Sequence, residues 1–148
     1  MAYFRGKLLY HVVCEMRTLQ EDATVGERIR FYRMKRDMTS YMLAEIVGLS
    51  RFAIMDYEND QTEPPLDDLK KMAAALGVEA DKLYDDYYRF LDYPYSAKIK
   101  EIRIAYNLLQ RELGAMLGVT RRAVERWENG RHRVTRDMWK AIIAKGFI

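Results

Sequence analysis

The chain has 148 residues, enough for two small cores of roughly 55 to 65 residues each. Its one cysteine, Cys14, excludes an intramolecular disulfide framework and suits a reducing compartment. The net charge of +3 is uneven: residues 25–92 carry 10 Lys and Arg against 14 Asp and Glu, whereas residues 93–148 carry 12 against 5. The apolar runs are short and no signal-peptide cleavage site is visible, so we expect a cytoplasmic protein.

The N-terminal segment, residues 1–24, gives the weakest structural signal. Apolar residues between Leu9 and Met16 are spaced for one face of a helix, which we prefer, although Val12 and Val13 also favour a strand. This segment is expected to precede the first folded module.

A first helical module is expected over residues 25–92. Thr24 with Glu27 three positions later is a capping-box pattern, so a helix should begin at Val25 and run to about Asp37. Two short helices follow within residues 39–60, and Pro64 and Pro65 break the chain. Further helices are expected at 66–76, ended by Gly77, and at 80–91.

The second module, residues 93–148, repeats this order with expected helices at 97–107, 110–117, 121–129 and 136–145. Gly114 would let the third of the module's helices approach the second, and Gly118 supplies the positive φ of a tight turn. Thr120 would cap the helix that follows, with Val124 and Trp127 facing the core. No counterpart of the 80–91 helix follows, so the N-terminal segment or that helix should cover this module's exposed face.

The two modules align with each other at an offset of 70 residues without a gap. Leu43 aligns with Leu113, and Gly48 aligns with Gly118. Two copies of one helical module explain this better than chance does.

Residues 108–131, LLQRELGAMLGVTRRAVERWENGR, resemble the lambda-repressor-like (Cro/CI, xenobiotic-response-element) helix-turn-helix proteins, whose sequences run close to TQxELAxxLGVSxxxVSxWExG. The residues in step with that pattern are Gln110, Leu113, Leu117, Gly118, Val119, Val124, Trp127, Glu128, Asn129 and Gly130. The resemblance implies an all-α fold of two tandem helix-turn-helix modules, with four to five helices each. It also implies that Arg33 and Glu58, and Arg103 and Glu128, form ion pairs that join helices within each module.

The resemblance makes double-stranded DNA the expected ligand of the second module. Arginine suits bidentate donation to guanine in the major groove, so base and phosphate contacts are expected from the helix at 121–129. Glu125 would either accept from a cytosine or orient an arginine, and both remain open. The expected DNA-binding residues are Gln110, Thr120, Arg121, Arg122, Glu125, Arg126, Asn129, Arg131 and Arg133.

The first module retains the residues that determine the fold and loses most of those that would contact bases, so its recognition of bases is expected to be lost or changed. Phe52, Met55 and Asp56 stand where the second module has Arg122, Glu125 and Arg126. Its net charge is negative, whereas that of the second module is positive. We therefore expect the second module to contact nucleic acid.

Other chemistry finds little support. The tyrosines between Tyr84 and Tyr95 could stack on single-stranded bases, but the neighbouring acids favour core packing or a protein interface. His11, Cys14 and His132 cannot make a convincing zinc site. No nucleophile with a paired base, phosphate-binding glycine loop or dinucleotide motif is present, so no enzyme, metal or cofactor is expected.

The sequence thus predicts a sequence-specific DNA-binding transcriptional regulator of the repressor type, which binds double-stranded DNA and forms a homodimer through the first module. An alternative is an antitoxin-like adaptor, in which the acidic first module binds a protein partner and the basic second module tethers it to DNA. Sequence preference distinguishes the two, because a tether shows steep salt dependence without a preferred site. No membrane association is expected.

Overall fold

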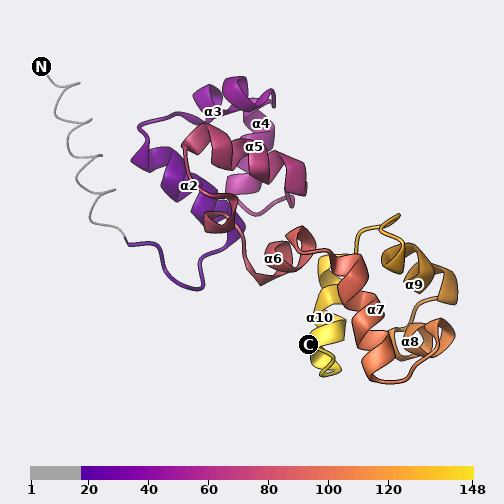
Figure 1. The fold of residues 1–148 in the computed structure, drawn as a ribbon. Coiled ribbons are helices and arrows are strands. Elements are labelled where there is room, and N and C mark those ends of the chain that lie inside the picture. The colour runs from indigo at the N-terminus through magenta and orange to yellow at the C-terminus, as the bar shows by residue number, and fades with distance from the viewer. Residues whose placement is uncertain (1–17) are drawn as a thin grey trace, which may run out of the picture. The chain divides into compact units, whose positions relative to one another are not determined.

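The computed structural model describes residues 18–148, which contain nine α-helices, one 3-10 helix and no strand (Figure 1). The chain divides into two compact units, a first that ends at Asp85 and a second from Asp86 to Ile148. The all-α architecture of tandem modules predicted from the sequence is confirmed in these residues. The helix expected between Leu9 and Met16 lies outside the described residues.

In the first unit, α2 (Val25–Lys35), α3 (Ser40–Val47), α4 (Arg51–Glu58) and α5 (Leu66–Leu76) are followed by the 3-10 helix η1 (Ala80–Lys82). The predicted capping box is confirmed: the Thr24 hydroxyl accepts from the Glu27 N–H at 3.1 Å, and the Glu27 carboxylate accepts from the Thr24 N–H at 2.8 Å. Gly48 and Gly77 end α3 and α5 with φ of +73° and +67°, a region that glycine enters without steric cost.

The second unit contains α6 (Asp86–Asp92), α7 (Tyr95–Ala105), α8 (Gln110–Leu117), α9 (Arg121–Glu128) and α10 (Arg136–Ala144). Each of α7 to α10 begins 70 residues after its counterpart among α2 to α5, so the repeat detected in the sequence is also a structural repeat. Two of the sharp turns recur as well, since Asn107 and Gly118 have positive φ, as Asp37 and Gly48 do.

The two cores are built from residues at matching positions of the repeat. Ile29, Leu43 and Ile54 are fully buried in the first unit, and their counterparts in the second unit are buried as well. The core of the second unit consists of Ile99, Ile102, Leu113, Leu117, Val124, Trp127, Val134, Ile142 and Phe147. Burial of these side chains, at roughly 1.5–3 kcal/mol each, is the main stabilising contribution to a module of this size.

Residues 80–92 differ from the single helix that the sequence predicts at 80–91. The apolar residues there are spaced for one helix, but η1 ends at Lys82 and α6 begins at Asp86. The interruption coincides with the division between the units, whereas the sequence predicted a module boundary after Asp92. The two halves of the segment diverge because they pack in different units. Helix η1 contacts α5, whereas α6 belongs to the second unit and contacts α7.

Helix α6 covers the part of the second unit that was expected to lack a fifth helix. Tyr87, Tyr88 and Leu91 are buried, and the Tyr87 ring lies 5.8 Å from the ring of Trp139 in α10. The sequence predicted that either the N-terminal segment or the 80–91 helix covers this face. The later half of the 80–91 segment, as α6, does so. Separately, no helix within residues 18–148 has the length and apolar character needed to cross a membrane.

Candidate nucleic-acid interface

The turn between α8 and α9 has the geometry that its glycines predict. A Cβ added to Gly114 would lie 2.8 Å from the Val119 carbonyl oxygen, so only glycine allows the chain to pass this close. Gly118 has a φ of +71°, and the Thr120 hydroxyl caps α9 by accepting from the Ala123 N–H at 3.2 Å. These contacts fix the angle at which α9 leaves α8.

Helix α9 has one buried face and one cationic face. Val124 and Trp127 are buried in the core, as predicted. Arg121, Arg122 and Arg126 are exposed. Arg122 and Arg126 form no ion pair or side-chain hydrogen bond with any other residue in 18–148. Within the described residues, no acceptor competes for their guanidinium groups.

Glu125 lies beside one of these arginines. A carboxylate oxygen of Glu125 is 3.7 Å from Nη2 of Arg121, one helical turn away, and both side chains are substantially exposed. Two roles were left open for Glu125, accepting from a cytosine and orienting an arginine. The ion pair with Arg121 is the contact that the second role requires. An exposed pair of this kind contributes only about 0.3–0.5 kcal/mol to stability, so Arg121 can exchange its partner at little cost.

A buried ion pair fixes α9 to α7. Arg103 donates from Nε and Nη2 to the Glu128 carboxylate at 2.6 and 3.3 Å, and from Nη1 to the Leu108 carbonyl at 3.1 Å. Burial disfavours the charged form of Glu128, but the bonds from Arg103 and Gln110 outweigh it and hold the pKa of Glu128 below its usual value. The structural pair that the resemblance implied is therefore present.

Two expected contact residues flank this pair. The Gln110 amide donates to the Glu128 carboxylate at 2.9 Å, a partner within the module that the sequence did not indicate. Asn129 is exposed and ends α9 as its C-cap residue. Gln110 therefore contributes to the fixed orientation of α9 in addition to any contact with a ligand.

The loop after α9 adds two more exposed cations, Arg131 and Arg133, neither of which has an ion-pair partner within residues 18–148. The Arg126 carbonyl accepts from the N–H groups of Arg131 and His132 at 2.8 and 3.3 Å, which ties the loop to the end of α9. All nine expected DNA-binding residues thus lie on α8, α9 or the segments that directly adjoin them.

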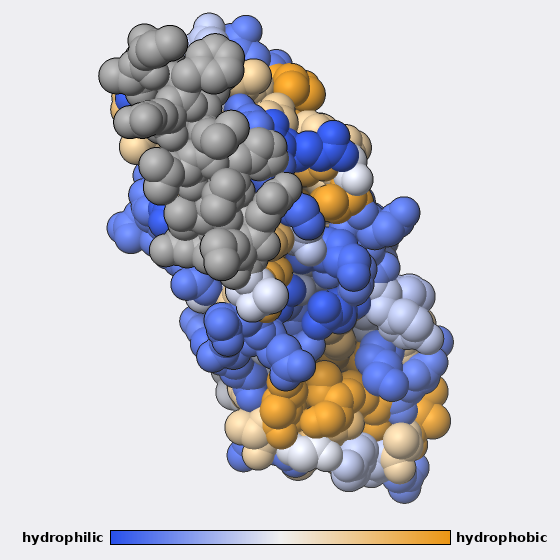
Figure 2. Space-filling model, turned by 90° about the vertical axis from the view of Figure 1, so that its left-hand side faces the viewer, coloured by the Kyte–Doolittle hydropathy of each residue, from blue (hydrophilic) through white to orange (hydrophobic). Residues whose placement is uncertain are grey.

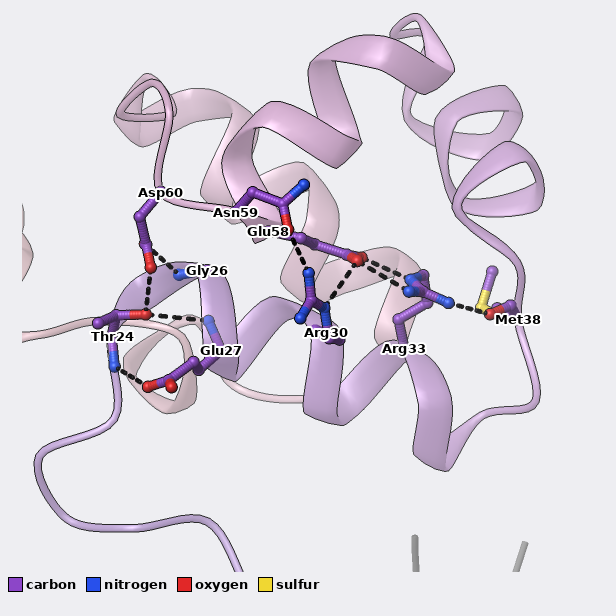
Figure 3. A network of polar contacts seen from close by, with 9 residues as sticks. All are labelled: Thr24, Gly26, Glu27, Arg30, Arg33, Met38, Glu58, Asn59 and Asp60. Atoms are coloured by element: carbon purple, nitrogen blue, oxygen red, sulfur yellow. Dashed lines mark hydrogen bonds and ion pairs between the residues drawn. The ribbon is translucent and has the colours of Figure 1, made fainter. Parts of the chain in front are cut away.

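The first unit has the same framework with a different surface. Arg33 donates twice to Glu58, as Arg103 does to Glu128, and Arg30 approaches the same carboxylate at 3.5 Å (Figure 3). Arg30 also donates to the Asn59 side chain. Asn59 is the counterpart of Asn129, one of the expected DNA-binding residues. The side-chain oxygen of Asn59 therefore already accepts a hydrogen bond within the first unit.

The loop after α4 is tied to the start of α2 by Asp60. Its carboxylate accepts from the Thr24 hydroxyl at 2.7 Å and from the Gly26 N–H at 3.2 Å (Figure 3). On α4 itself, Phe52 is 69% exposed and Asp56 is also exposed, where the second unit has arginines. This surface has the fold of the second unit's interface and keeps only Arg51, the counterpart of Arg121, among the arginines of α9.

The sequence did not identify Tyr87 and Tyr95 as contributors to this region. Their hydroxyls donate to the carbonyls of Val134 and His132 at 2.8 and 3.2 Å. Such contacts between distant residues leave no periodic pattern in a sequence. Within residues 18–148 no group of three or more His, Cys, Asp or Glu side chains is placed to hold a metal ion.

Comparison with known proteins agrees with this geometry. The chain is 34% identical over 84 residues to the immunity repressor protein of Bacillus phage phi105, an alignment that covers 57% of this chain and 52% of the phage protein. The chain therefore spans about half the length of that relative. No solved structure matches the chain. A helix-turn-helix family model matches residues 29–83 and 99–145, most of both modules, and the chain belongs to this Cro/CI-type helix-turn-helix family.

Proposed function

We propose that this protein is a sequence-specific DNA-binding transcriptional regulator of the repressor type, which contacts the major groove with α9. The observation that carries the proposal is the exposed cationic face of α9, where Arg122 and Arg126 have no partner in residues 18–148. The family match and the similarity to a protein named as an immunity repressor support DNA binding and transcription regulation.

Charge supports assignment of the contact to the second unit. Residues 86–148 carry 13 Lys and Arg against 7 Asp and Glu, a net charge of +6. In the first unit Phe52, Met55 and Asp56 replace the residues that would contact bases. A carboxylate at that position would repel the phosphate backbone, so the first unit is proposed to support binding without base contacts.

Homodimer formation is the second part of the proposal. Proteins that insert one helix into the major groove commonly bind as dimers on half-sites about one helical turn apart. Both units expose large apolar residues, and Figure 2 shows such a patch (orange) at the bottom of the view, in the second unit. The exposed residues are Tyr41, Met42, Ile46, Phe52 and Met55 in the first unit and Tyr93, Ile104, Tyr106, Leu109, Met116, Ile143 and Ile148 in the second. Surfaces of this kind often mark protein contacts.

The adaptor alternative draws on the same apolar residues of α3 and α4 in the first unit, and neither comparison adds support to it. The two functions differ in sequence preference. An adaptor that only tethers a partner to DNA would bind all duplexes alike, with strong salt dependence. A regulator would prefer one site.

Selection of bound duplexes from a random library tests the proposal directly. The wild type should enrich one motif, and the Arg122→Ala/Arg126→Ala variant should weaken or change it, because each bidentate arginine contributes about 1–3 kcal/mol of base discrimination. The Lys140→Ala/Lys145→Ala variant is the matched control, since it removes the same charge from the same unit but not from α9. This control should retain the motif. Failure of the wild type to enrich any motif at moderate salt would refute sequence-specific regulation.

A further inference from the structure

We propose that Tyr87 and Tyr95 are positioning residues that hold the loop after α9 so that Arg133 contacts a DNA phosphate, an inference that rests on the proposed function. Arg133 lies between two carbonyl groups that accept from these tyrosines. The Tyr95 hydroxyl donates to the His132 carbonyl at 3.2 Å, and the Tyr87 hydroxyl donates to the Val134 carbonyl at 2.8 Å.

These contacts fix the backbone on both sides of Arg133 while its side chain stays in solvent. The Val134 side chain is fully buried in the core, which anchors the loop in addition to the two tyrosine hydrogen bonds. Arg133 itself is exposed and has no ion-pair partner within residues 18–148. A long cation on a fixed backbone loses less conformational entropy when it binds than one on a mobile loop does.

The two tyrosines are themselves held in place. Tyr87 is 1% exposed, with its ring 5.8 Å from that of Trp139 and 4.5 Å from the guanidinium carbon of Arg136. The Tyr95 ring lies 6.3 Å from that of Phe90, a residue of α6 that packs on the core. The donors therefore transmit the rigidity of the folded unit to the loop.

Comparison of the repeats links these tyrosines to the cation. In the first unit, Val25 occupies the position of Tyr95, and Glu63 occupies the position of Arg133. The first unit, in which residues that would contact bases are replaced, thus lacks both the hydroxyl of Tyr95 and the cation of Arg133. Tyr87 and Tyr95 also lie outside the segment of the second unit that matches the family, residues 99–145.

A phosphate contact has a signature that separates it from base recognition. Phosphate contacts position the protein without carrying sequence information, so they change affinity on all sequences alike. Each one also contributes about one unit to the slope of log affinity against log salt. Loss of the Arg133 contact should therefore lower affinity and slope together and leave the preferred motif unchanged.

The test uses the full chain and a fluorescent duplex that carries the enriched motif, titrated by anisotropy at several salt concentrations. The variants are Tyr95→Phe, Arg133→Ala and the two combined. Tyr95 is chosen over Tyr87 because it is only half-buried, so its substitution leaves the core intact. Tyr106→Phe is the matched control, since it removes a hydroxyl that donates to the Gly146 carbonyl at 3.0 Å in the same unit.

We expect Tyr95→Phe to weaken binding by about two- to tenfold, the effect of one hydrogen bond. Arg133→Ala should lower the salt slope by about 1, and the double variant should bind no more weakly than Arg133→Ala alone. Tyr106→Phe should bind as the wild type does. The enriched motif should be the same for all four proteins.

Three results would overturn the inference. The first is Tyr95→Phe binding that equals the Tyr106→Phe control, the second is an additive loss in the double variant, and the third is an unchanged salt slope in Arg133→Ala. In all three cases wild-type binding and the Arg122 and Arg126 effects would still support the proposed function. Absence of any duplex binding by the wild type would instead overturn both.

Discussion

Replacement of Glu128 by glutamine probes the ion pair that fixes α9 in the second unit. The substitution preserves shape but removes the charge that accepts from Arg103 and Gln110. Loss of one partner of a fully buried ion pair costs about 3–5 kcal/mol, because the other charge is stranded. The Arg103 and Glu128 side chains are 18% and 6% exposed, and glutamine keeps one acceptor, so we expect a loss of about 2 kcal/mol.

Tryptophan fluorescence during urea unfolding measures the free energy of unfolding of the second unit, which contains Glu128. The chain has two tryptophans, Trp127 and Trp139, and both belong to the second unit. The matched control is Glu125→Gln, which removes the exposed pair with Arg121 on the same helix. The control should change the free energy of unfolding by less than about 0.5 kcal/mol. A Glu128→Gln loss no larger than that of the control would refute a stabilising role for the buried pair.

The same pair predicts a pH dependence. The pKa of Glu128 is lowered from its ordinary value of 4.5 in the folded protein. A carboxyl group with a depressed pKa stabilises the fold above its unfolded pKa, and that contribution is lost as pH falls through the folded pKa. The stability difference between wild type and Glu128→Gln should therefore be full at neutral pH and shrink below about pH 4.5. A difference that stays constant into acid would contradict this assignment.

Substitutions at three positions in α8 and in the turn that follows it can be tested by the same unfolding assay. Gly118→Ala should destabilise the unit by about 1 kcal/mol, because φ is +71° and no neighbour limits the added Cβ. Gly114→Ala should cost about 1–3 kcal/mol, since its Cβ would meet the Val119 carbonyl. Thr120→Ala should cost about 1 kcal/mol and Thr120→Ser little, as serine keeps the cap. Unchanged stability in any of the three alanine variants would contradict the corresponding contact.

Much of the fold could be predicted because its determinants are local. Caps such as Thr24 and Thr120, and glycines such as Gly48 and Gly118, mark helix ends by their own backbone requirements. The offset of 70 residues then allowed each module to support the interpretation of the other. Exposure of the arginines on α9 followed from the burial of Val124 and Trp127 on its opposite face.

The features that the sequence did not reveal depend on tertiary contacts. Leu83, Tyr84, Tyr87 and Tyr88 are spaced as on one continuous helix, and only the separate burial of the two halves explains the break between η1 and α6. The bond from Gln110 to Glu128 was equally hidden, because a glutamine at that position is also compatible with an external contact. Roles for the nine candidate DNA-binding residues remain predictions that the binding experiments address.

The position of α6 in the chain has a consequence for the order in which the second unit assembles. Tyr87 lies near the start of this unit, and the Val134 carbonyl that it contacts lies 47 residues later. Closure of so long a segment has an entropic cost that must be met before the contact stabilises anything. During synthesis, α6 is the first helix of the second unit to be made, and its tyrosines cannot reach their partners in this unit until the segment before α10 has been made. A polypeptide that begins after Asp92 would escape this wait but would leave the Val134 carbonyl without its donor.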